Sequence, residues 1–213
     1  MSSTASDRVR FLRAFVQSPR YVGSVVPSSA RLAEAMVGPV DFATAELIVE
    51  LGAGTGPFTK LISRRLAPDT RALVFERDQA MSNTLQDRYP NLEFHSDALE
   101  LAELVRSANG SGVDAVVCSL PFATFPRAMR TRITHDIHRV LRPGGKLIAV
   151  QYSTQMRRSF QALFDSVSLS LVPLNVPPAI VYTCTKGTSA PQPRPSSHPA
   201  THEFAGVVDH DYS

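Results

Sequence analysis

The residues best suited to chemistry lie in a glycine-rich segment, residues 50–56 (ELGAGTG), which ends a short apolar run. Glycines at such a position let the backbone turn sharply and approach a ligand closely. A helix that starts beyond the turn presents free N–H groups to a carboxylate or phosphate. The GxGxG spacing differs from the GxGxxG of dinucleotide sites and from the GxxxxGK[ST] of nucleoside triphosphate sites. The segment therefore predicts a ligand-binding turn, with a tight strand–helix turn that binds nothing as the alternative.

Two carboxylates follow the next two apolar runs at positions that suit a nucleoside. Glu76 ends the run 72–75, 20 residues beyond the last of these glycines, where a carboxylate can accept hydrogen bonds from both hydroxyls of a ribose. Asp97 follows the run 92–95 and is placed to accept a bond from an adenine amino group. The alternatives are a solvated strand end or a partner for Arg77 in the case of Glu76, and a helix N-cap in the case of Asp97.

These residues need a scaffold in which several strands end at the same edge. Short β-rich runs alternate with helical spacing, which predicts an α/β fold with a mostly parallel sheet and helices on both faces. Ligands in such sheets bind beyond the carboxyl ends of the strands. The predicted strands are residues 47–51, 72–75, 92–95, 113–120, 146–151, 168–175 and 179–185, and the predicted helices between them include residues 58–66, 80–89, 99–107 and 127–141.

Composition limits the class of protein. The chain has 213 residues, of which 43% are hydrophobic, and this length fits one domain with short appendages. Two cysteines cannot form a disulfide framework, no metal-site spacing is present, and a reducing cytosol is the expected compartment. The net charge of +3 is too small to argue for nucleic acid. The sequence has neither the run of about 20 apolar residues that spans a membrane nor the apolar block of a secretory signal.

The chain divides into three zones. Residues 1–38 are expected to form an amphipathic helix and a lid segment, residues 39–186 the globular domain, and residues 187–213 a disordered tail rich in proline and serine. On a helical wheel of the first helix, apolar side chains share one arc, and Arg10 and Arg13 lie opposite. Such a helix can lie in a membrane interface and attract anionic headgroups, or it can dock on the sheet by its apolar face.

In this order, the motifs resemble those of the class I S-adenosylmethionine-dependent methyltransferases. ELGAGTG is similar to their first cofactor motif, FERD supplies the acidic ribose residue, SDAL the adenine-side residue, and VLRPGGKL the turn before the fifth strand. The resemblance covers residues 45–155 and implies a Rossmann-like fold of seven strands with additional N-terminal helices, and S-adenosyl-L-methionine as the cofactor. The cofactor-binding residues that it implies are Glu50, Gly52, Ala53, Gly54, Thr55, Gly56, Glu76, Arg77, Asp97, Ala98, Ser119 and Leu120.

The end of the fourth predicted strand, residues 119–122 (SLPF), bears on the methyl acceptor. Enzymes that methylate adenine amines carry a related Asn/Asp-Pro-Pro-Tyr/Phe or Asn-Leu-Pro-Tyr motif, in which a polar side chain and backbone carbonyls hold the amine and an aromatic ring packs on it. Serine in place of Asn or Asp weakens amide-type recognition of a base. Ser119 and Phe122 are therefore candidate catalytic residues, with an apolar strand end closed by proline as the alternative.

A second resemblance narrows the acceptor. The segments RYVGSVVPSSARLAEAM, IVELGAGTG and VVCSLPF look like those of the bacterial phospholipid N-methyltransferases, which convert phosphatidylethanolamine stepwise to phosphatidylcholine. That family is related to the rRNA adenine dimethyltransferases, so methylation of rRNA adenine or of a small-molecule amine is the alternative. The resemblance implies that a neutral amine attacks the sulfonium methyl group. Tyr21 is a candidate catalytic residue, as a base or, with Phe122, as an aromatic contact to the methylated cation, and simple packing is its alternative role.

The same resemblance implies a substrate, a membrane partner and a cellular location for the protein. The expected substrate is a phospholipid, whose phosphate an arginine would hold, with Arg20, Arg127 and Arg130 as candidates. The first helix is expected to bind an anionic membrane surface, so the protein would be cytoplasmic and peripherally associated with the inner face of the membrane. A monomer that binds no nucleic acid is expected.

Overall fold

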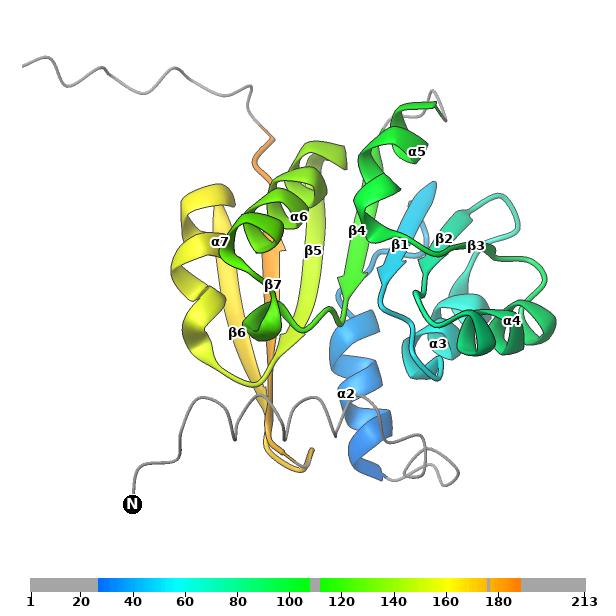
Figure 1. Cartoon of the computed structure of the whole chain (residues 1–213), viewed down its shortest axis with the longest axis horizontal. Helices are drawn as coiled ribbons and strands as arrows, with labels where there is room; N and C mark the ends of the chain where they lie inside the picture. Colours follow the sequence, from blue (N-terminus) through cyan, green and yellow to red (C-terminus); the bar gives the residue numbers. More distant parts are fainter. Residues whose placement is uncertain (1–26, 108–111, 176, 189–213) are drawn as a thin grey trace, which may run out of the picture.

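A single sheet of seven strands forms the centre of the protein (Figure 1). The structure is a computed structural model that describes residues 27–107, 112–175 and 177–188. The predicted first helix, Tyr21 and the proline-rich tail lie outside these residues. The strand order in the sheet is β3-β2-β1-β4-β5-β7-β6, which confirms the predicted seven-stranded α/β fold.

The strands run mostly in one direction. Every neighbouring pair is parallel except the two pairs that include β7, which is antiparallel to both β5 and β6. The carboxyl ends of the other six strands therefore meet at one edge of the sheet. The strands are β1 (Leu47–Leu51), β2 (Arg71–Phe75), β3 (Glu93–His95), β4 (Val113–Cys118), β5 (Leu141–Gln151), β6 (Ser166–Val172) and β7 (Ala179–Thr185).

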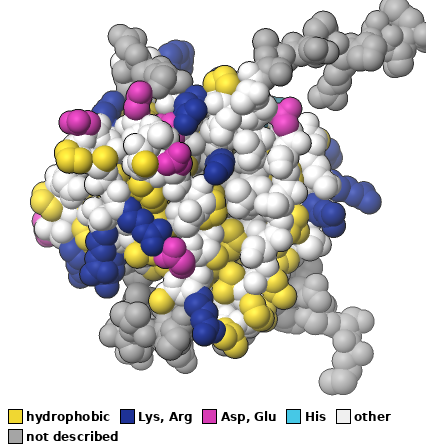
Figure 2. All heavy atoms as spheres, turned by 180° about the vertical axis from the view of Figure 1, so that it is seen from behind, with side chains coloured by type: hydrophobic (Ala, Val, Ile, Leu, Met, Phe, Trp, Pro, Cys, Tyr) yellow, Lys and Arg dark blue, Asp and Glu magenta, His cyan; other side chains and the backbone are white. Residues whose placement is uncertain are grey.

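Helices cover both faces of the sheet. One apolar cluster joins one face of the strands to α2, α3 and α4, and the other joins the opposite face to α5, α6 and α7. Figure 2 shows the side that faces away in Figure 1, where basic side chains are dispersed among acidic and hydrophobic ones. The helices are α2 (Pro27–Val37), α3 (Pro57–Arg65), α4 (Gln79–Arg88), α5 (Leu101–Ser107), α6 (Arg127–Val140) and α7 (Arg157–Leu163), with short 3₁₀ turns η2 (Ala98–Glu100), η3 (Phe122–Thr124) and η4 (Thr154–Met156).

The two central strands are buried on both faces, which explains their sequences. Every residue of β1 and of β4 is buried, and both strands are almost wholly apolar. Near-continuous apolar runs are typical of parallel strands that helices cover on both sides. The two charged residues in these strands, both buried, are Glu50 at the carboxyl end of β1 and Asp114 near the start of β4.

Asp114 ties three strands together at the edge opposite the site. Its carboxylate accepts hydrogen bonds from the backbone N–H groups of Glu46 (2.8 Å) and Leu47 (2.9 Å) and from the guanidinium of Arg142. A buried carboxylate is stable only when it is paired and hydrogen-bonded, and these contacts meet that need. The starts of β1, β4 and β5 are thereby held in register.

Two predicted boundaries at the middle of the sheet are wrong. The strand predicted to reach residue 120 ends at Cys118, and β5 starts at Leu141 rather than at residue 146. Leu141 pairs with Val113 and Lys146 with Ala115, so residues 142–145 form a bulge inside the strand rather than a turn before it.

The long helix α6 ends one residue earlier than the sequence predicts. Its last residue is Val140, and the carbonyl groups at this end are satisfied from a distant part of the chain. The ammonium of Lys186 donates to the carbonyl oxygens of His138 (2.8 Å) and Leu141 (2.6 Å). A cation at a helix C-terminus also interacts favourably with the helix dipole.

Candidate cofactor site

The glycine-rich turn connects the carboxyl end of β1 to α3. Gly52, Gly54 and Gly56 have φ values of 80°, 57° and 82°. Residues with a Cβ rarely adopt such values, which explains why glycine occupies all three positions. The N–H of Gly52 donates to the carbonyl of Phe75 at the end of β2 (2.8 Å), so the turn is held against the neighbouring strand.

The three glycines differ in what surrounds them. A Cβ at Gly54 would meet no atom within 4 Å. A Cβ at Gly52 would lie 3.2 Å from side-chain atoms of both Ser119 and Leu120, and one at Gly56 would overlap Leu85 of α4. Gly56 therefore permits close packing, whereas Gly54 borders open space that a ligand can occupy.

Glu76 connects the end of β2 to this turn. Its Oε2 accepts a hydrogen bond from the N–H of Gly54 (2.6 Å), and its Oε1 accepts one from the N–H of Asp78 (2.8 Å). Each carboxylate oxygen has a further lone pair for a ligand hydroxyl. Arg77 is exposed, and within the described residues no ion pair joins it to Glu76.

Asp97 and Ala98 lie just beyond the end of β3. The exposed carboxylate of Asp97 accepts a hydrogen bond from the N–H of Leu99 (2.9 Å), so it caps the short turn η2. Ala98 is half-buried and packs against the core. The capping role that the sequence leaves open is thus present in the structure, and contact with adenine stays a prediction.

Glu50 is the most unusual group at the site. It is buried, and neither of its carboxyl oxygens has a hydrogen-bond partner among the described residues. Burial raises its pKa to about 8, an effect that neighbouring Thr59 opposes and the charge of Glu76 reinforces. The Thr59 hydroxyl is also buried and has no hydrogen-bond partner among the described residues. An unpartnered buried carboxyl beside an open turn suits a ligand that brings a cation or hydrogen-bond donors.

The segment after β4 lies against the glycine turn. The hydroxyl of Ser119 donates to the carbonyl of Gly52, and the Ser119 N–H donates to the carbonyl of Leu51 (2.9 Å). Phe122 is fully buried, and its ring makes edge contacts with Phe125 and Phe160 at centroid distances of 6.2 Å. The structure therefore brings Ser119 to the cofactor motif and places Phe122 in the core beneath α7.

Gln151 is a site residue that the sequence did not reveal. It ends β5, is buried, and its Nε2 donates to the carbonyl of Leu120 (3.0 Å) in the segment after β4. The sequence does show a polar residue at the end of an apolar strand, but it does not show that this residue contacts Leu120, which is distant in the sequence. Asp78 was also missed: it caps α4 by accepting from the N–H of Met81 (3.0 Å).

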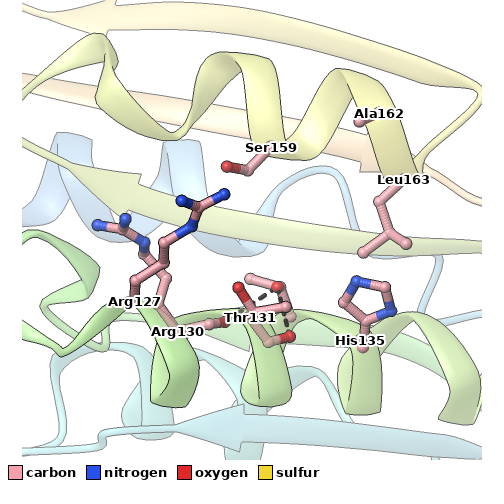
Figure 3. A pocket seen from close by; sticks show the side chains of 8 residues that line it. Arg127, Arg130, Thr131, His135, Ser159, Ala162 and Leu163 are labelled. Carbon is pink, nitrogen blue, oxygen red and sulfur yellow. Dashed lines mark hydrogen bonds between the residues drawn. The ribbon is translucent and has the colours of Figure 1, made fainter.

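A hollow of about 200 Å³ lies in another part of the molecule, between α6 and α7 (Figure 3). None of its lining residues belongs to the glycine turn or to the carboxylates around it. The cofactor site is therefore located by its hydrogen bonds, glycine geometry and unpartnered carboxyl.

Comparisons with known proteins agree with this geometry. Residues 48–145 match the family described as "Methyltransferase domain". The ornithine lipid N-methyltransferase of Singulisphaera acidiphila is 32% identical over 186 residues, which are 84% of this chain and 95% of that protein. The ribosomal RNA small subunit methyltransferase A of Thermotoga maritima is 26% identical over 110 residues, which are 50% of this chain and 37% of that protein.

Solved structures show the same fold at low identity. The magnesium protoporphyrin IX methyltransferase of Synechocystis PCC 6803, solved with bound S-adenosylmethionine, superposes with a TM-score of 0.60. It is 12% identical, and the alignment covers 88% of this chain and all of that one. The strand order, the glycine turn and the relative that matches along most of the chain show that this protein belongs to the class I S-adenosylmethionine-dependent methyltransferases. It is an enzyme of that family, and its cofactor is S-adenosylmethionine.

Proposed function

We propose that the protein transfers a methyl group from S-adenosylmethionine to the primary amine of a membrane lipid headgroup. The observation that carries this proposal is the similarity to an ornithine lipid N-methyltransferase along 95% of that relative's length. The similarity to the rRNA methyltransferase covers only 37% of that protein. Phosphatidylethanolamine, which the sequence resemblance indicates, and ornithine lipid, which the name of the relative indicates, are the two proposed acceptors.

The proposed cofactor contacts are those that the family resemblance implies, and the geometry of the turn supports two of them. The Glu76 carboxylate would accept hydrogen bonds from the ribose hydroxyls, and the buried Glu50 carboxyl would face the cationic amino-acid end. The remaining proposed contacts come from Gly52, Ala53, Gly54, Thr55, Gly56, Arg77, Asp97, Ala98, Ser119 and Leu120. When bound, the cofactor supplies a methyl group on a positively charged sulfur, which is an electrophile.

The contribution of the protein is to position the amine. A neutral amine attacks the methyl carbon in line with the departing sulfur, so the nitrogen must lie close to that carbon and be free of its proton. We propose that the segment 119–122 holds the amine, because the Ser119 hydroxyl and the backbone of this segment are fixed against the glycine turn. The Gln151 side chain fixes the Leu120 carbonyl in the same segment. Tyr21 is the proposed aromatic or basic partner from the N-terminal region.

Membrane association is part of the proposal. The basic amphipathic pattern of the first residues supports binding to an anionic surface at the inner face of the membrane. Among the helices of the described residues, none has the length and apolarity needed to cross a bilayer. Sedimentation with anionic vesicles, with and without residues 1–20, tests the contribution of this segment: unaffected binding after the deletion would contradict it.

Transfer of labelled methyl groups tests the proposed activity. The full chain is incubated with methyl-labelled S-adenosylmethionine and vesicles that contain phosphatidylethanolamine, ornithine lipid, or neither. Label in the lipid fraction from either amine-containing vesicle supports the proposal and identifies the acceptor. Label only in an added rRNA transcript or in a soluble amine would overturn it. Glu76→Ala serves as the control that impairs the cofactor site.

A further inference from the structure

The hollow between α6 and α7 has arginine side chains at one end and the side chains of His135 and Leu163 at the other (Figure 3). The end that carries the arginines, which we call the polar end, is lined by Arg127, Arg130 and Thr131 of α6 and Ser159 of α7. One guanidinium group extends from α6 into the gap towards Ser159, and the other lies beside it and points away from Ser159. We call this hollow the α6–α7 groove.

The two arginines of the groove have no counterion among the residues that the structure describes. Within the described residues neither Arg127 nor Arg130 forms an ion pair. The one acidic residue in the sequences of α6 and α7 is Asp136, which pairs with Arg139 (3.2 Å) and Arg132 (3.7 Å). The polar end of the groove is therefore positively charged and attracts an anion.

The donors in the groove suit a phosphate. Guanidinium groups bind phosphate oxygens through two parallel N–H bonds, which a simple point charge cannot do. The hydroxyls of Thr131 and Ser159 line the same cavity, and neither has a hydrogen-bond partner in the part of the chain that the structure describes. Two forked cations and two free hydroxyls can satisfy several oxygens of one phosphate group.

The surroundings of the groove favour a lipid as the source of the phosphate. α6 follows β4 and α7 follows β5, so both helices start at the carboxyl edge of the sheet (Figure 1). β6 runs parallel to β5 and ends at the same edge, where Leu171 and Leu174 are 62% and 58% exposed. Exposed large apolar side chains at the same edge of the molecule as unpaired arginines are consistent with a surface that lies on a membrane.

We propose that the α6–α7 groove binds the phosphate of a membrane phospholipid. The carboxyl edge of the sheet, which carries the cofactor site, would then face the lipid surface. This inference rests on the proposed function, because it takes the partner to be a lipid membrane. It goes beyond that function by placing a phosphate contact on the folded domain itself, apart from the N-terminal segment.

Vesicle sedimentation with the full chain tests the groove. The double variant Arg127→Ala/Arg130→Ala is compared with Arg64→Ala/Arg88→Ala, which removes the same charge from exposed positions on α3 and α4. With vesicles of phosphatidylglycerol in phosphatidylcholine, the groove variant is expected to lose at least about tenfold in partitioning, and the control variant less than about twofold. Equal losses in the two variants would overturn the proposal.

Two further arms separate phosphate recognition from general charge. Arg127→Lys/Arg130→Lys keeps the charge but loses the forked donors, so it is expected to lose partitioning as well; partitioning like that of the unmodified chain would overturn the proposal. In the second arm, binding of a single-stranded RNA is measured. If Arg127→Ala/Arg130→Ala abolishes RNA binding but leaves vesicle binding unchanged, the groove binds nucleic acid and the proposal is overturned.

The outcomes distinguish the groove from the enzymatic activity. The proposed function fails if the unmodified chain methylates no lipid, whereas the groove fails if Arg127→Ala/Arg130→Ala partitions like the unmodified chain. An unchanged affinity of the double variant for S-adenosylhomocysteine shows that it is folded, because that ligand uses the glycine turn and not the groove.

Discussion

The N–H of Gly54 donates a hydrogen bond of 2.6 Å to the carboxylate of Glu76, across the gap between the ends of β1 and β2. One residue comes from the glycine turn and the other from the end of the neighbouring strand. The bond fixes the position of the carboxylate before any ligand binds. The acceptor proposed for the ribose is therefore part of the folded structure of the cofactor site.

Replacement of Glu76 by alanine is expected to weaken the binding of S-adenosylhomocysteine by roughly 1–3 kcal/mol, because two hydrogen bonds to a charged acceptor are lost. Isothermal titration calorimetry measures this change. Glu103→Ala, which removes an exposed carboxylate from α5, is the matched control and should bind normally. An unchanged affinity of the Glu76 variant would show that the ribose lies elsewhere.

Alanine at Gly54 and alanine at Gly56 should have opposite consequences. At Gly54 the added Cβ enters open space, so the free energy of unfolding should fall by only about 1 kcal/mol, while ligand binding weakens by about 1–3 kcal/mol. At Gly56 the Cβ overlaps Leu85, so the free energy of unfolding should fall by about 2–4 kcal/mol. Urea unfolding and calorimetry measure the two quantities, and equal stability losses in both variants would contradict this distinction.

Glu50 should make stability depend on pH. Burial raises its pKa in the folded protein from 4.5 to about 8, so unfolding releases a proton between these values. The free energy of unfolding should therefore fall as the pH rises from about 4.5 to about 8. Above that range this group causes no further change, and the full loss of stability remains.

Glu50→Gln isolates this contribution. The variant should unfold with a flatter pH dependence over the same range and be more stable than the unmodified chain at its upper end, because no buried charge forms. Urea titrations at several pH values measure both effects. The same slope in the two proteins would assign the dependence to other groups.

Gln151 is expected to act as a positioning residue for the segment after β4. In Gln151→Leu the Leu120 carbonyl loses its 3.0 Å hydrogen bond, so kcat should fall several-fold while the affinity for S-adenosylhomocysteine stays within about twofold. Steady-state kinetics with the methyl acceptor and calorimetry give the two values. Gln155→Leu, at an exposed position of η4, is the control. A parallel loss of kcat and cofactor affinity would point to a general disturbance of the sheet edge.

Local patterns in the sequence account for most of the fold. The apolar runs at residues 47–51 and 72–75 correspond to β1 and to all but the first residue of β2, because strands buried on both faces need nearly continuous apolar side chains. The glycine turn was recognisable because its positive φ values demand glycine at three alternate positions.

Contacts between distant parts of the chain account for what the sequence did not predict. The early start of β5 depends on pairing between Leu141 and Val113, and the end of α6 is bound by Lys186. The roles of Gln151 and Asp114 depend likewise on partners that lie 31 and 28 residues away. Periodicity and composition report on local structure and burial, and they carry no information on which distant polar groups meet.

Mass spectrometry of the lipid product tests the central claim most directly. The full chain is incubated with S-adenosylmethionine and vesicles that contain phosphatidylethanolamine and ornithine lipid, and the lipids are then fragmented to locate any added methyl group. A new methyl group on the headgroup nitrogen of either lipid, absent with Glu76→Ala, is the predicted result. Lipids that remain unmethylated while the protein binds S-adenosylhomocysteine would contradict the claim, because they would show a working cofactor site with a different acceptor.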